Sequence, residues 1–319
     1  MKNLKRKLTI ILALVVGVLL IDVTAYAKTY KGLFVYWRGE TACGQGFKEG
    51  LKNLGYKISA TEFNANKDKK KLNKFLSSIK EKDFDFVYTF GTTVSVTSAK
   101  YIKNTPIFFG IVTNPLKAGL VKSWENSGNN TTGVSHAIPY GDQVDFILRI
   151  GEIKSIGIIY NPKEQNSIIA KTELDSLLKK RGVSLKAYPA GNKGAIQRAV
   201  KKISSDRPDI VYLPSDSFIV DNGGKIISAL TAAKMPTYGA LEKFINEQGA
   251  MIGIVSSYKS VGLALAENAD QVFKGKSPRN VPSRTLPENM LTIKINGKTV
   301  ESIGYDIPYQ IISLAEIIE

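Results

Sequence analysis

Short apolar runs alternate along the chain with longer segments whose apolar residues recur every three or four positions. Residues 84–90 are typical of a buried strand, whereas the spacing of Leu72, Leu76 and Ile79 places these side chains on one face of a helix. Strands are expected at residues 32–37, 57–60, 84–90, 107–112, 155–160, 184–188, 209–213, 236–238 and 251–255. Strands that alternate with helices in this way predict an α/β fold with parallel sheets covered on both faces.

The pattern restarts after a loop rich in Asn, Gly and Ser at residues 126–130. Because 319 residues exceed the usual size of one domain, two domains with separate cores are expected. Each half has a strand that runs into Asn-Pro and then a helix start, at Asn114-Pro115 and Asn161-Pro162. Ligands of open parallel sheets bind at this kind of junction, outside the carboxyl ends of the strands. The two junctions therefore predict two similar lobes that face each other across a cleft.

The last part of the chain has a different pattern. A helix is expected over residues 261–272, a strand over 291–295, a short helix near Val300, and a final apolar helix after Ile307-Pro308. These segments come too late to begin a third domain. We expect them to cross between the lobes and to complete a hinge of several strands.

The N-terminus has the features of a secretory signal. Basic residues within 2–7 precede an apolar run at 8–21 and an Ala25-Tyr26-Ala27 site. The apolar run is shorter than the roughly 20 residues that a membrane-spanning helix needs. Residues 1–27 are therefore interpreted as a cleaved signal peptide, with an uncleaved anchor as the alternative, and the mature chain is expected to be periplasmic or extracytoplasmic.

The formal net charge is +16 at pH 7. The lysines are spread over all predicted helices and are not interleaved with aromatic residues, which indicates a solvated surface and no nucleic-acid partner. Cys43 and His136 are the only residues of their kinds, so no disulfide, no two-histidine zinc site and no His–Cys pair can be assembled within the chain. Phosphate-binding and dinucleotide-binding glycine motifs are missing as well. We expect no cofactor and no metal, and a binding protein instead of an enzyme.

Polar residues follow the predicted strand ends of both halves. A hydroxyl beside a helix N-terminus suits a carboxylate, and Asp216, at the end of the strand 209–213, suits an ammonium group. The alternative for the threonines and for Asp216 is plain helix capping, and for Glu242 a first-turn charge. Arg38 and Glu40 either hold the two ends of a zwitterion or pair with each other. The candidate ligand-binding residues are Trp37, Arg38, Glu40, Thr41, Thr92, Thr93, Thr113, Asn114, Tyr140, Asn161, Asn166, Ser167, Asp216, Ser217 and Glu242.

Several motifs in order resemble one family. They are the segments 46–56 (GFKEGLKNLGY), 106–115 (PIFFGIVTNP), 132–135 (TGVS), 157–162 (GIIYNP) and 214–216 (PSD). Together they resemble the periplasmic solute-binding proteins of ABC importers, in the subgroup built like the branched-chain amino-acid binders. The resemblance covers essentially the whole mature chain.

This resemblance implies two Rossmann-like lobes, as in type I periplasmic binding proteins, joined by three hinge crossings. The N-terminal lobe would comprise residues 28–138 and 257–284, and the C-terminal lobe residues 139–256 and 285–319. It also implies a small ligand trapped by closure and delivered to a membrane permease driven by a cytoplasmic ATPase. The charged loop 37–41, and Ser217-Phe218 where the family often has Asn after the Asp, depart from the family pattern. The ligand therefore cannot be copied from relatives.

We therefore expect an exported solute-binding protein that closes on a small polar metabolite, an amino acid or a related carboxylate, without converting it. A ligand-sensing module for a membrane receptor is the first alternative. An exported hydrolase on an α/β scaffold is the second.

Overall fold

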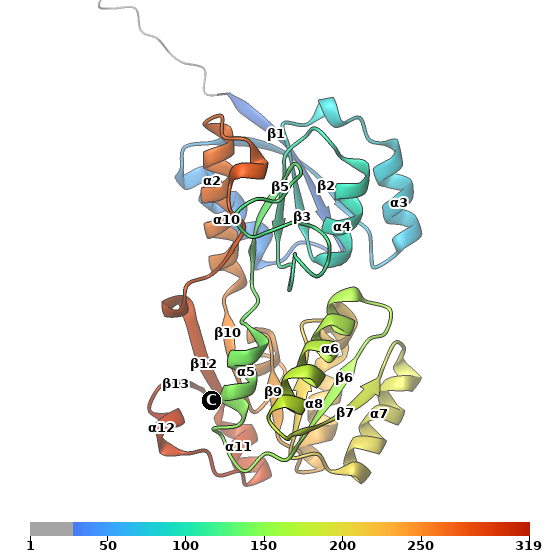
Figure 1. Cartoon of the computed structure of the whole chain (residues 1–319), viewed down its shortest axis with the longest axis vertical. Coiled ribbons are helices and arrows are strands. Elements are labelled where there is room, and N and C mark those ends of the chain that lie inside the picture. Colours follow the sequence, from blue (N-terminus) through green and yellow to red (C-terminus); the bar gives the residue numbers. More distant parts are fainter. Residues whose placement is uncertain (1–27) are drawn as a thin grey trace, which may run out of the picture.

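The computed structural model describes residues 28–319 and shows two α/β lobes stacked end to end (Figure 1). The first lobe contains a six-stranded sheet in the order β11-β5-β4-β3-β1-β2, and the second a seven-stranded sheet in the order β13-β12-β10-β9-β8-β6-β7. The described strand pairs are parallel except for the antiparallel pair β10 and β12. The predicted architecture of two mostly parallel sheets is confirmed. The predicted signal peptide, residues 1–27, lies outside the described residues.

The sheet of the first lobe is covered on both faces by helices. Its strands are β1 (Thr29–Tyr36), β2 (Lys57–Asn64), β3 (Phe86–Phe90), β4 (Ile107–Gly110), β5 (Thr131–Ser135) and β11 (Arg284–Thr285). Its helices are α2 (Ala42–Asn53), α3 (Lys69–Ser78), α4 (Thr92–Tyr101) and α10 (Tyr258–Phe273). Phe34 and Phe47 belong to the core between the sheet and helices α2 and α10, whereas Leu33 and Leu72 belong to the core on the side of α3 and α4.

Helices α2 and α10 approach each other closely at two glycines. A Cβ atom at Gly262 would lie 2.1 Å from the carbonyl oxygen of Cys43, and one at Gly46 would lie 2.4 Å from the carbonyl oxygen of Lys259. Both distances are too short for any side chain. The thiol of Cys43 is buried in this core, where it packs as a small apolar side chain. The close packing fixes the position of α2, which begins beside the cleft.

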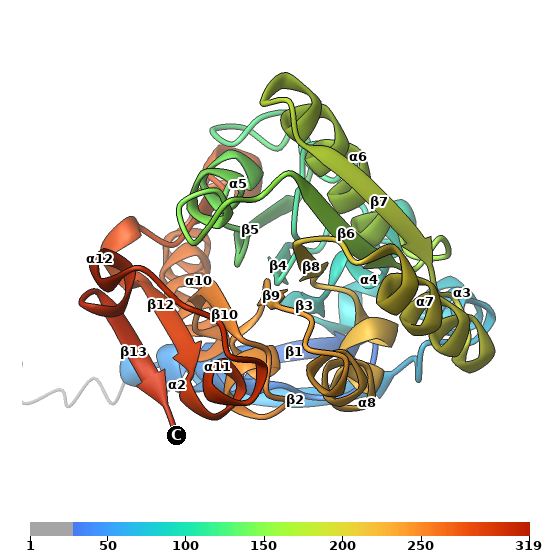
Figure 2. The ribbon, with the colours of Figure 1, turned by 90° about the horizontal axis from the view of Figure 1, so that it is seen from below.

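The second lobe has the same layered arrangement. Its strands are β6 (Ser155–Tyr160), β7 (Ser184–Pro189), β8 (Ile210–Leu213), β9 (Thr237–Gly239), β10 (Ile252–Ser256), β12 (Leu291–Asn296) and β13 (Ala315–Ile318). Its helices are α5 (Tyr140–Ile147), α6 (Gln165–Lys180), α7 (Lys193–Asp206), α8 (Ser217–Ala232), α9 (Glu242–Asn246), α11 (Gly297–Ile303) and α12 (Tyr309–Ile312). Figure 2 shows α5 and α6 on one side of β6 and β8, and α7 and α8 on the other, in agreement with the two cores of this lobe.

The chain passes between the lobes at three places. These are the connections from β5 to α5, from β10 to α10, and from β11 to β12. The strand β10 therefore belongs to the second lobe, while α10, which follows directly, covers the sheet of the first lobe. Neighbouring positions at these crossings, such as Ser256 and Tyr258, lie at the boundary between the lobes. Three short crossings permit the lobes to move against each other as rigid bodies.

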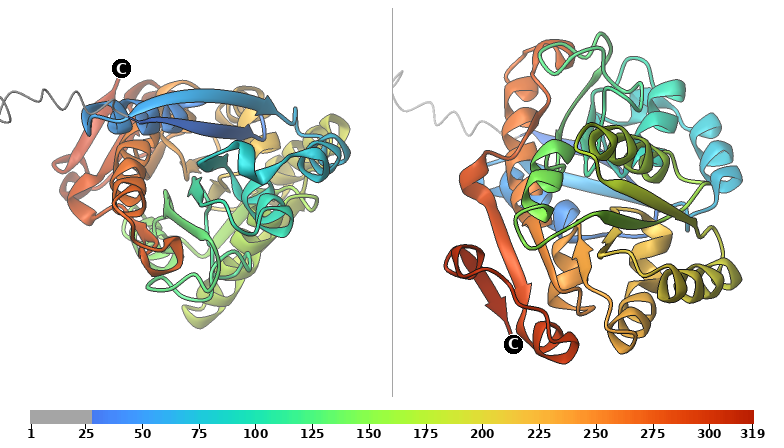
Figure 3. Two further views of the ribbon diagram at one scale, coloured as in Figure 1. Left: turned by 90° about the horizontal axis from the view of Figure 1, so that it is seen from above. Right: turned by 60° about the horizontal axis from the view of Figure 1, so that its bottom comes forward.

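The C-terminal segment differs from the prediction. Instead of one final apolar helix after Pro308, the chain forms the short helix α12 and then the strand β13, which pairs in parallel with β12 (Figure 3). A short apolar run fits a helix or a strand equally well, and the free edge of β12 decides in favour of the strand. The strand β5 was also missing from the prediction, because the Gly133 within it interrupts the apolar pattern. Within residues 28–319, no helix combines the length and apolar character needed to cross a bilayer.

Candidate functional site

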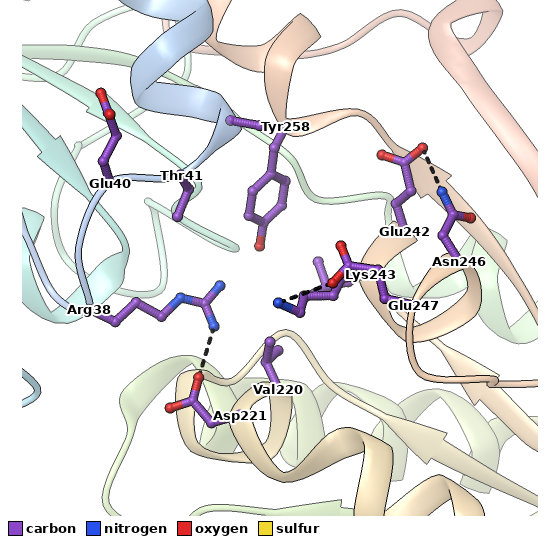
Figure 4. Close-up of a pocket in the computed structure, with 12 residues that line it drawn as sticks. Arg38, Glu40, Thr41, Val220, Asp221, Glu242, Lys243, Asn246, Glu247 and Tyr258 are labelled. Carbon is purple, nitrogen blue, oxygen red and sulfur yellow. Dashed lines mark hydrogen bonds and ion pairs between the residues drawn. The ribbon is translucent and has the colours of Figure 1, made fainter.

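The carboxyl ends of strands from both lobes meet at a small cavity. This central cavity has a volume of about 20 Å³. Its polar lining comes from the ends of β1, β3, β6 and β8, and from the start of α10. The lining residues are Trp37, Arg38, Phe90, Gly91, Thr92, Thr93, Ile111, Glu164, Asn166, Ser215, Asp216, Ser217, Val220 and Tyr258. A wider outer chamber of about 420 Å³ adjoins it (Figure 4).

Helix α4 of the first lobe begins at the central cavity. The strand β3 ends at Phe90, and Gly91 turns the chain into the helix with a φ of 88°, a value that favours glycine. Gly91 has no side chain to cap the helix, and the first turn contains no acidic residue. The Thr92 hydroxyl is buried there without a hydrogen-bond partner among the described residues. The free amides of a helix N-terminus attract negative charge, so this wall suits a carboxylate.

The end of β1 supplies an aromatic ring and a cation. Trp37 is 5% exposed, and its buried indole Nε1 has no hydrogen bond of normal geometry to any described residue. The guanidinium of Arg38 lies 5.6 Å from the centre of the Phe90 ring. Its nearest carboxylate is Asp221 of the opposite lobe, at 3.9 Å.

Two buried carboxyl groups form the wall of the second lobe. Glu164 is 7% exposed and precedes α6, and Asp216 is 1% exposed and precedes α8. Asp216 caps α8, because its Oδ1 accepts a hydrogen bond of 2.7 Å from the amide of Ile219. Its Oδ2 is buried and has no partner among the described residues. The amide of Ser217 donates to Oε2 of Glu164 at 3.4 Å, so that both carboxyls face the start of one helix.

Burial makes both carboxyls costly to ionise, and the charge of Glu164 adds to this cost for Asp216. Burial raises the pKa of Asp216 well above its usual range, and the charge of Glu164 raises it further. Burial also raises the pKa of Glu164, against the opposing effects of the Ser217 amide and the positive charge of Arg38. Two adjacent buried carboxyls that lack a direct cationic partner retain a proton between them. This wall therefore suits a cationic group that would replace the proton.

The lobes contact each other around the cavity. Asp221 of α8 pairs with both Arg38 and Lys67 of the first lobe. At the hinge, His136 Nε2 lies 2.9 Å from the hydroxyl of Ser215. Burial, with Arg38 nearby, lowers the pKa of His136 to about 3, so the ring is neutral at physiological pH. The structure thus represents a closed arrangement of the lobes.

The structure brings many of the predicted site residues together. Those that line the central cavity are Trp37, Arg38, Thr92, Thr93, Asn166, Asp216 and Ser217. Those that line the outer chamber are Arg38, Glu40, Thr41 and Glu242, and Thr113 and Tyr140 line a third cavity of about 20 Å³ at the hinge. Arg38 and Glu40 do not pair with each other, since Glu40 pairs with Lys48.

Three predicted residues line none of these cavities and make local contacts instead. Asn114 Oδ1 accepts a hydrogen bond from the amide of Lys117 at 3.0 Å. Asn161 Oδ1 accepts one from the amide of Lys163, also at 3.0 Å, and the Asn161 amide donates to the buried hydroxyl of Ser167 at 2.8 Å. Both asparagines therefore shape the turns that precede the helices.

Sequence reasoning missed Glu164, Ser215 and Tyr258. Glu164 had a usable signal, because it lies two residues after the Asn161-Pro162 junction and directly before the first turn of α6. Tyr258 had none, since its place at the cavity depends on the crossing from β10 into α10. No group of three or more metal-ligating side chains occurs in the described part of the chain.

Comparisons with known proteins agree with the two-lobed fold. The chain is 27% identical over 264 residues to a tyrosine-binding protein of Clostridioides difficile, covering 81% of this chain and 75% of the relative. A crystal structure of a conserved domain protein from Vibrio cholerae matches with a TM-score of 0.84 at 26% identity, over 92% of this chain and 100% of that one. A domain from Streptococcus pneumoniae in complex with L-Trp matches with a TM-score of 0.83 at 24% identity, over the same shares. Residues 34–318 match the family described as ABC transporter substrate binding protein, and the chain belongs to this family.

Proposed function

We propose that this protein binds a free α-amino acid between its lobes and holds the two charged ends on opposite walls. The ammonium group binds Glu164 and Asp216 of the second lobe, and the carboxylate binds the start of α4 with Thr92 and Thr93. The observation that carries the proposal is the pair of opposite walls at one cavity: the uncapped start of α4 with the unpartnered Thr92 hydroxyl, and the buried carboxyls of Glu164 and Asp216. Buried polar atoms normally have partners, and a zwitterion supplies partners of both signs.

The relatives support an amino acid as the ligand. One of them is named for tyrosine and another was crystallised with L-Trp. The sequence identities are low, so the support concerns the class of ligand and leaves the side chain open. The head group is common to all amino acids, and the central cavity contains the complementary charges for it.

Closure follows from the same arrangement. A ligand that touches Thr92 on one lobe and Asp216 on the other gains both contacts only when the lobes are closed, so it shifts the population toward the closed state. The central cavity in this state holds about 20 Å³, so the ligand enters with the lobes apart. In keeping with its family, the protein would then present the bound amino acid, unconverted, to an ABC permease on the extracytoplasmic side of the membrane.

Native mass spectrometry of freshly purified protein tests this proposal, followed by calorimetric titration with the standard L-amino acids. We expect one or a few amino acids to bind, and the bound molecule to be recovered unchanged. An N-acetylated or carboxyl-amidated form of the same amino acid should bind much more weakly, because each lacks one charge. Equal binding of either blocked form would contradict the proposal, as would the failure of every amino acid to bind.

A further inference from the structure

The outer chamber lies beside the central cavity and has its own lining. Both cavities are lined by Arg38, Val220 and Tyr258, so these three residues mark the passage between them. Figure 4 shows the guanidinium of Arg38 and the hydroxyl of Tyr258 pointing into the chamber, with Val220 below them. A group bound in the central cavity would extend into the chamber by displacing the side chains of Arg38 and Tyr258.

The available space is very uneven. The central cavity and the hinge cavity hold about 20 Å³ each, whereas the outer chamber holds about 420 Å³. A volume of about 20 Å³ accepts little more than one water molecule, whereas pockets for small organic ligands range from about 300 to 1,000 Å³. A head group would need the lobes to move slightly apart, whereas the chamber already has room for a large side chain.

The lining of the chamber is partly apolar and partly polar. Ala42, Val220 and Leu241 supply the apolar surface. Lys243 and Asn246 of α9 supply hydrogen-bonding groups, with Asn246 on the side away from Arg38 and the Lys243 ammonium pointing into the chamber (Figure 4). Such a surface suits a side chain with an apolar body and a polar end.

The lining carboxylates already have cationic partners. Glu40 pairs with Lys48 at 2.9 Å, and Glu242 pairs with Lys294 at 3.2 Å. Glu247 pairs with Lys243 at 3.3 Å. Arg38 at the passage shares Asp221 with Lys67, whereas the charges on the side of α9 balance locally and do not require a charged side chain. A neutral polar end is sufficient.

We propose that the outer chamber receives the side chain of the bound amino acid and selects a large side chain with a neutral hydrogen-bonding group at its far end. This inference rests on the proposed function and adds the location and the selectivity of the side-chain site. Val220 and Leu241 contact the body of the side chain, and Lys243 and Asn246 contact its polar end.

Filling the chamber tests the location. Ala42 is an exposed residue at the start of α2 that lines the chamber, so Ala42→Trp reduces the space with little risk to folding. Ala229→Trp is the matched control, because Ala229 is also exposed on a helix but lines none of these cavities. The measurement is calorimetric titration with large (tyrosine, tryptophan, glutamine) and small (glycine, alanine, serine) amino acids.

We expect the wild-type protein to bind at least one large amino acid, and Ala42→Trp to weaken that binding by at least about tenfold, the loss of a few good contacts. Ala229→Trp should keep the wild-type affinity within about twofold. Unchanged binding of the large amino acid by Ala42→Trp would overturn the inference. A wild-type protein that binds only small amino acids would overturn it too, while the proposed function would stand. If no amino acid binds the wild type, the proposed function itself fails.

Comparing tyrosine with phenylalanine tests the polar end of the side chain. The two differ only in the hydroxyl, which would reach Lys243 and Asn246. We expect tyrosine to bind at least about threefold more tightly than phenylalanine, as one additional hydrogen bond provides, and Asn246→Ala together with Lys243→Ala to remove this difference. Equal affinities in the wild type would overturn the selectivity for a polar end.

Discussion

The two lobes present helix N-termini to the same cavity, but with different side chains. In the first lobe, α4 begins at Gly91 with no capping side chain and no acidic residue. In the second lobe, α8 begins at Asp216, which caps it, and Glu164 lies against the same helix start. Helix N-termini attract anions, so the first wall is free to bind a carboxylate, whereas the second has its own carboxylates. Similar lobes thus acquire opposite preferences from a few residues at strand ends.

The two walls also differ in what their buried side chains cost the free energy of folding. Hydroxyls such as that of Thr92 are neutral and tolerate burial at modest cost. The buried carboxyls of Glu164 and Asp216 are costly to ionise, as their raised pKa values indicate. A cationic ligand would stabilise the ionised form of these carboxyls, so the second wall should contribute more to the binding free energy than the first. Five predictions test the comparison, beginning with the largest expected effect.

Replacing Asp216 with Asn should cause the largest loss of ligand affinity. Asn preserves the cap of α8 but removes the negative charge beside the ammonium group, a change worth on the order of 2–5 kcal/mol for a buried charge pair. Titration calorimetry with the best-bound amino acid measures it. Asp68→Asn is the control, since Asp68 caps α3 with hydrogen bonds to two amides. A loss below about tenfold would remove Asp216 from the ammonium site.

The same substitution should leave the ligand-free protein as stable as before or more stable at neutral pH. For a carboxyl whose folded pKa is raised, the unfolded chain ionises first as pH rises above about 4, so stability falls until the raised pKa is passed. Asp216→Asn has no carboxyl to ionise, so the part of the stability loss at neutral pH that comes from Asp216 should disappear. Thermal unfolding at pH 7 and pH 4 checks it, and a clear destabilisation confined to pH 7 would contradict it.

Lowering the pH should weaken binding. The ammonium group needs ionised carboxyls, and below their raised pKa each proton that the ligand must displace reduces affinity by up to about tenfold per pH unit. Titrations between pH 5 and 8 measure the slope, with the proton release read from buffers of different ionisation enthalpy. An affinity that does not change with pH in the wild type would show that no proton is displaced.

Changes on the first lobe should have smaller effects. Thr92→Val keeps the shape of the side chain and removes one neutral hydrogen bond, which costs about 0.5–1.5 kcal/mol of binding free energy. Ser98→Ala is the control, because Ser98 is also buried on α4 but lines none of the cavities. If Thr92→Val weakened binding as much as Asp216→Asn, the two walls would not differ in the way described.

The pair between the lobes should matter least. Asp221 contacts Arg38 and Lys67 at a partly exposed position, and such pairs contribute about 0–1 kcal/mol. Asp221→Asn should therefore change the affinity by less than about fivefold, and the change should disappear in high salt. A larger effect that persists in salt would assign Asp221 to the ligand site itself.

The sequence was informative about strands and their ends. The apolar runs identify β6 and β8, and polar residues after such runs, Asp216 among them, lie at the central cavity. Residues whose role depends on another part of the chain were harder to find. Glu164 acts with Asp216 only because two strand ends lie side by side, and Tyr258 reaches the cavity only through a crossing between the lobes.

Local chemistry also explains the predicted residues that line no cavity. Asn114 and Asn161 have the signature of a strand end, but their side chains accept hydrogen bonds from amides two or three residues later and are used within their turns. The strand β13 could not be separated from a helix by its four residues alone. Its identity depends on pairing with β12, which no local pattern contains.

A crystal structure of the protein with its best-bound amino acid tests the central claim most directly. We predict that the ammonium nitrogen lies within about 3.2 Å of a carboxylate oxygen of Glu164 or Asp216, and the carboxylate within the same distance of the first amides of α4. A ligand bound in the reverse orientation, or bound to one lobe only, would contradict the claim.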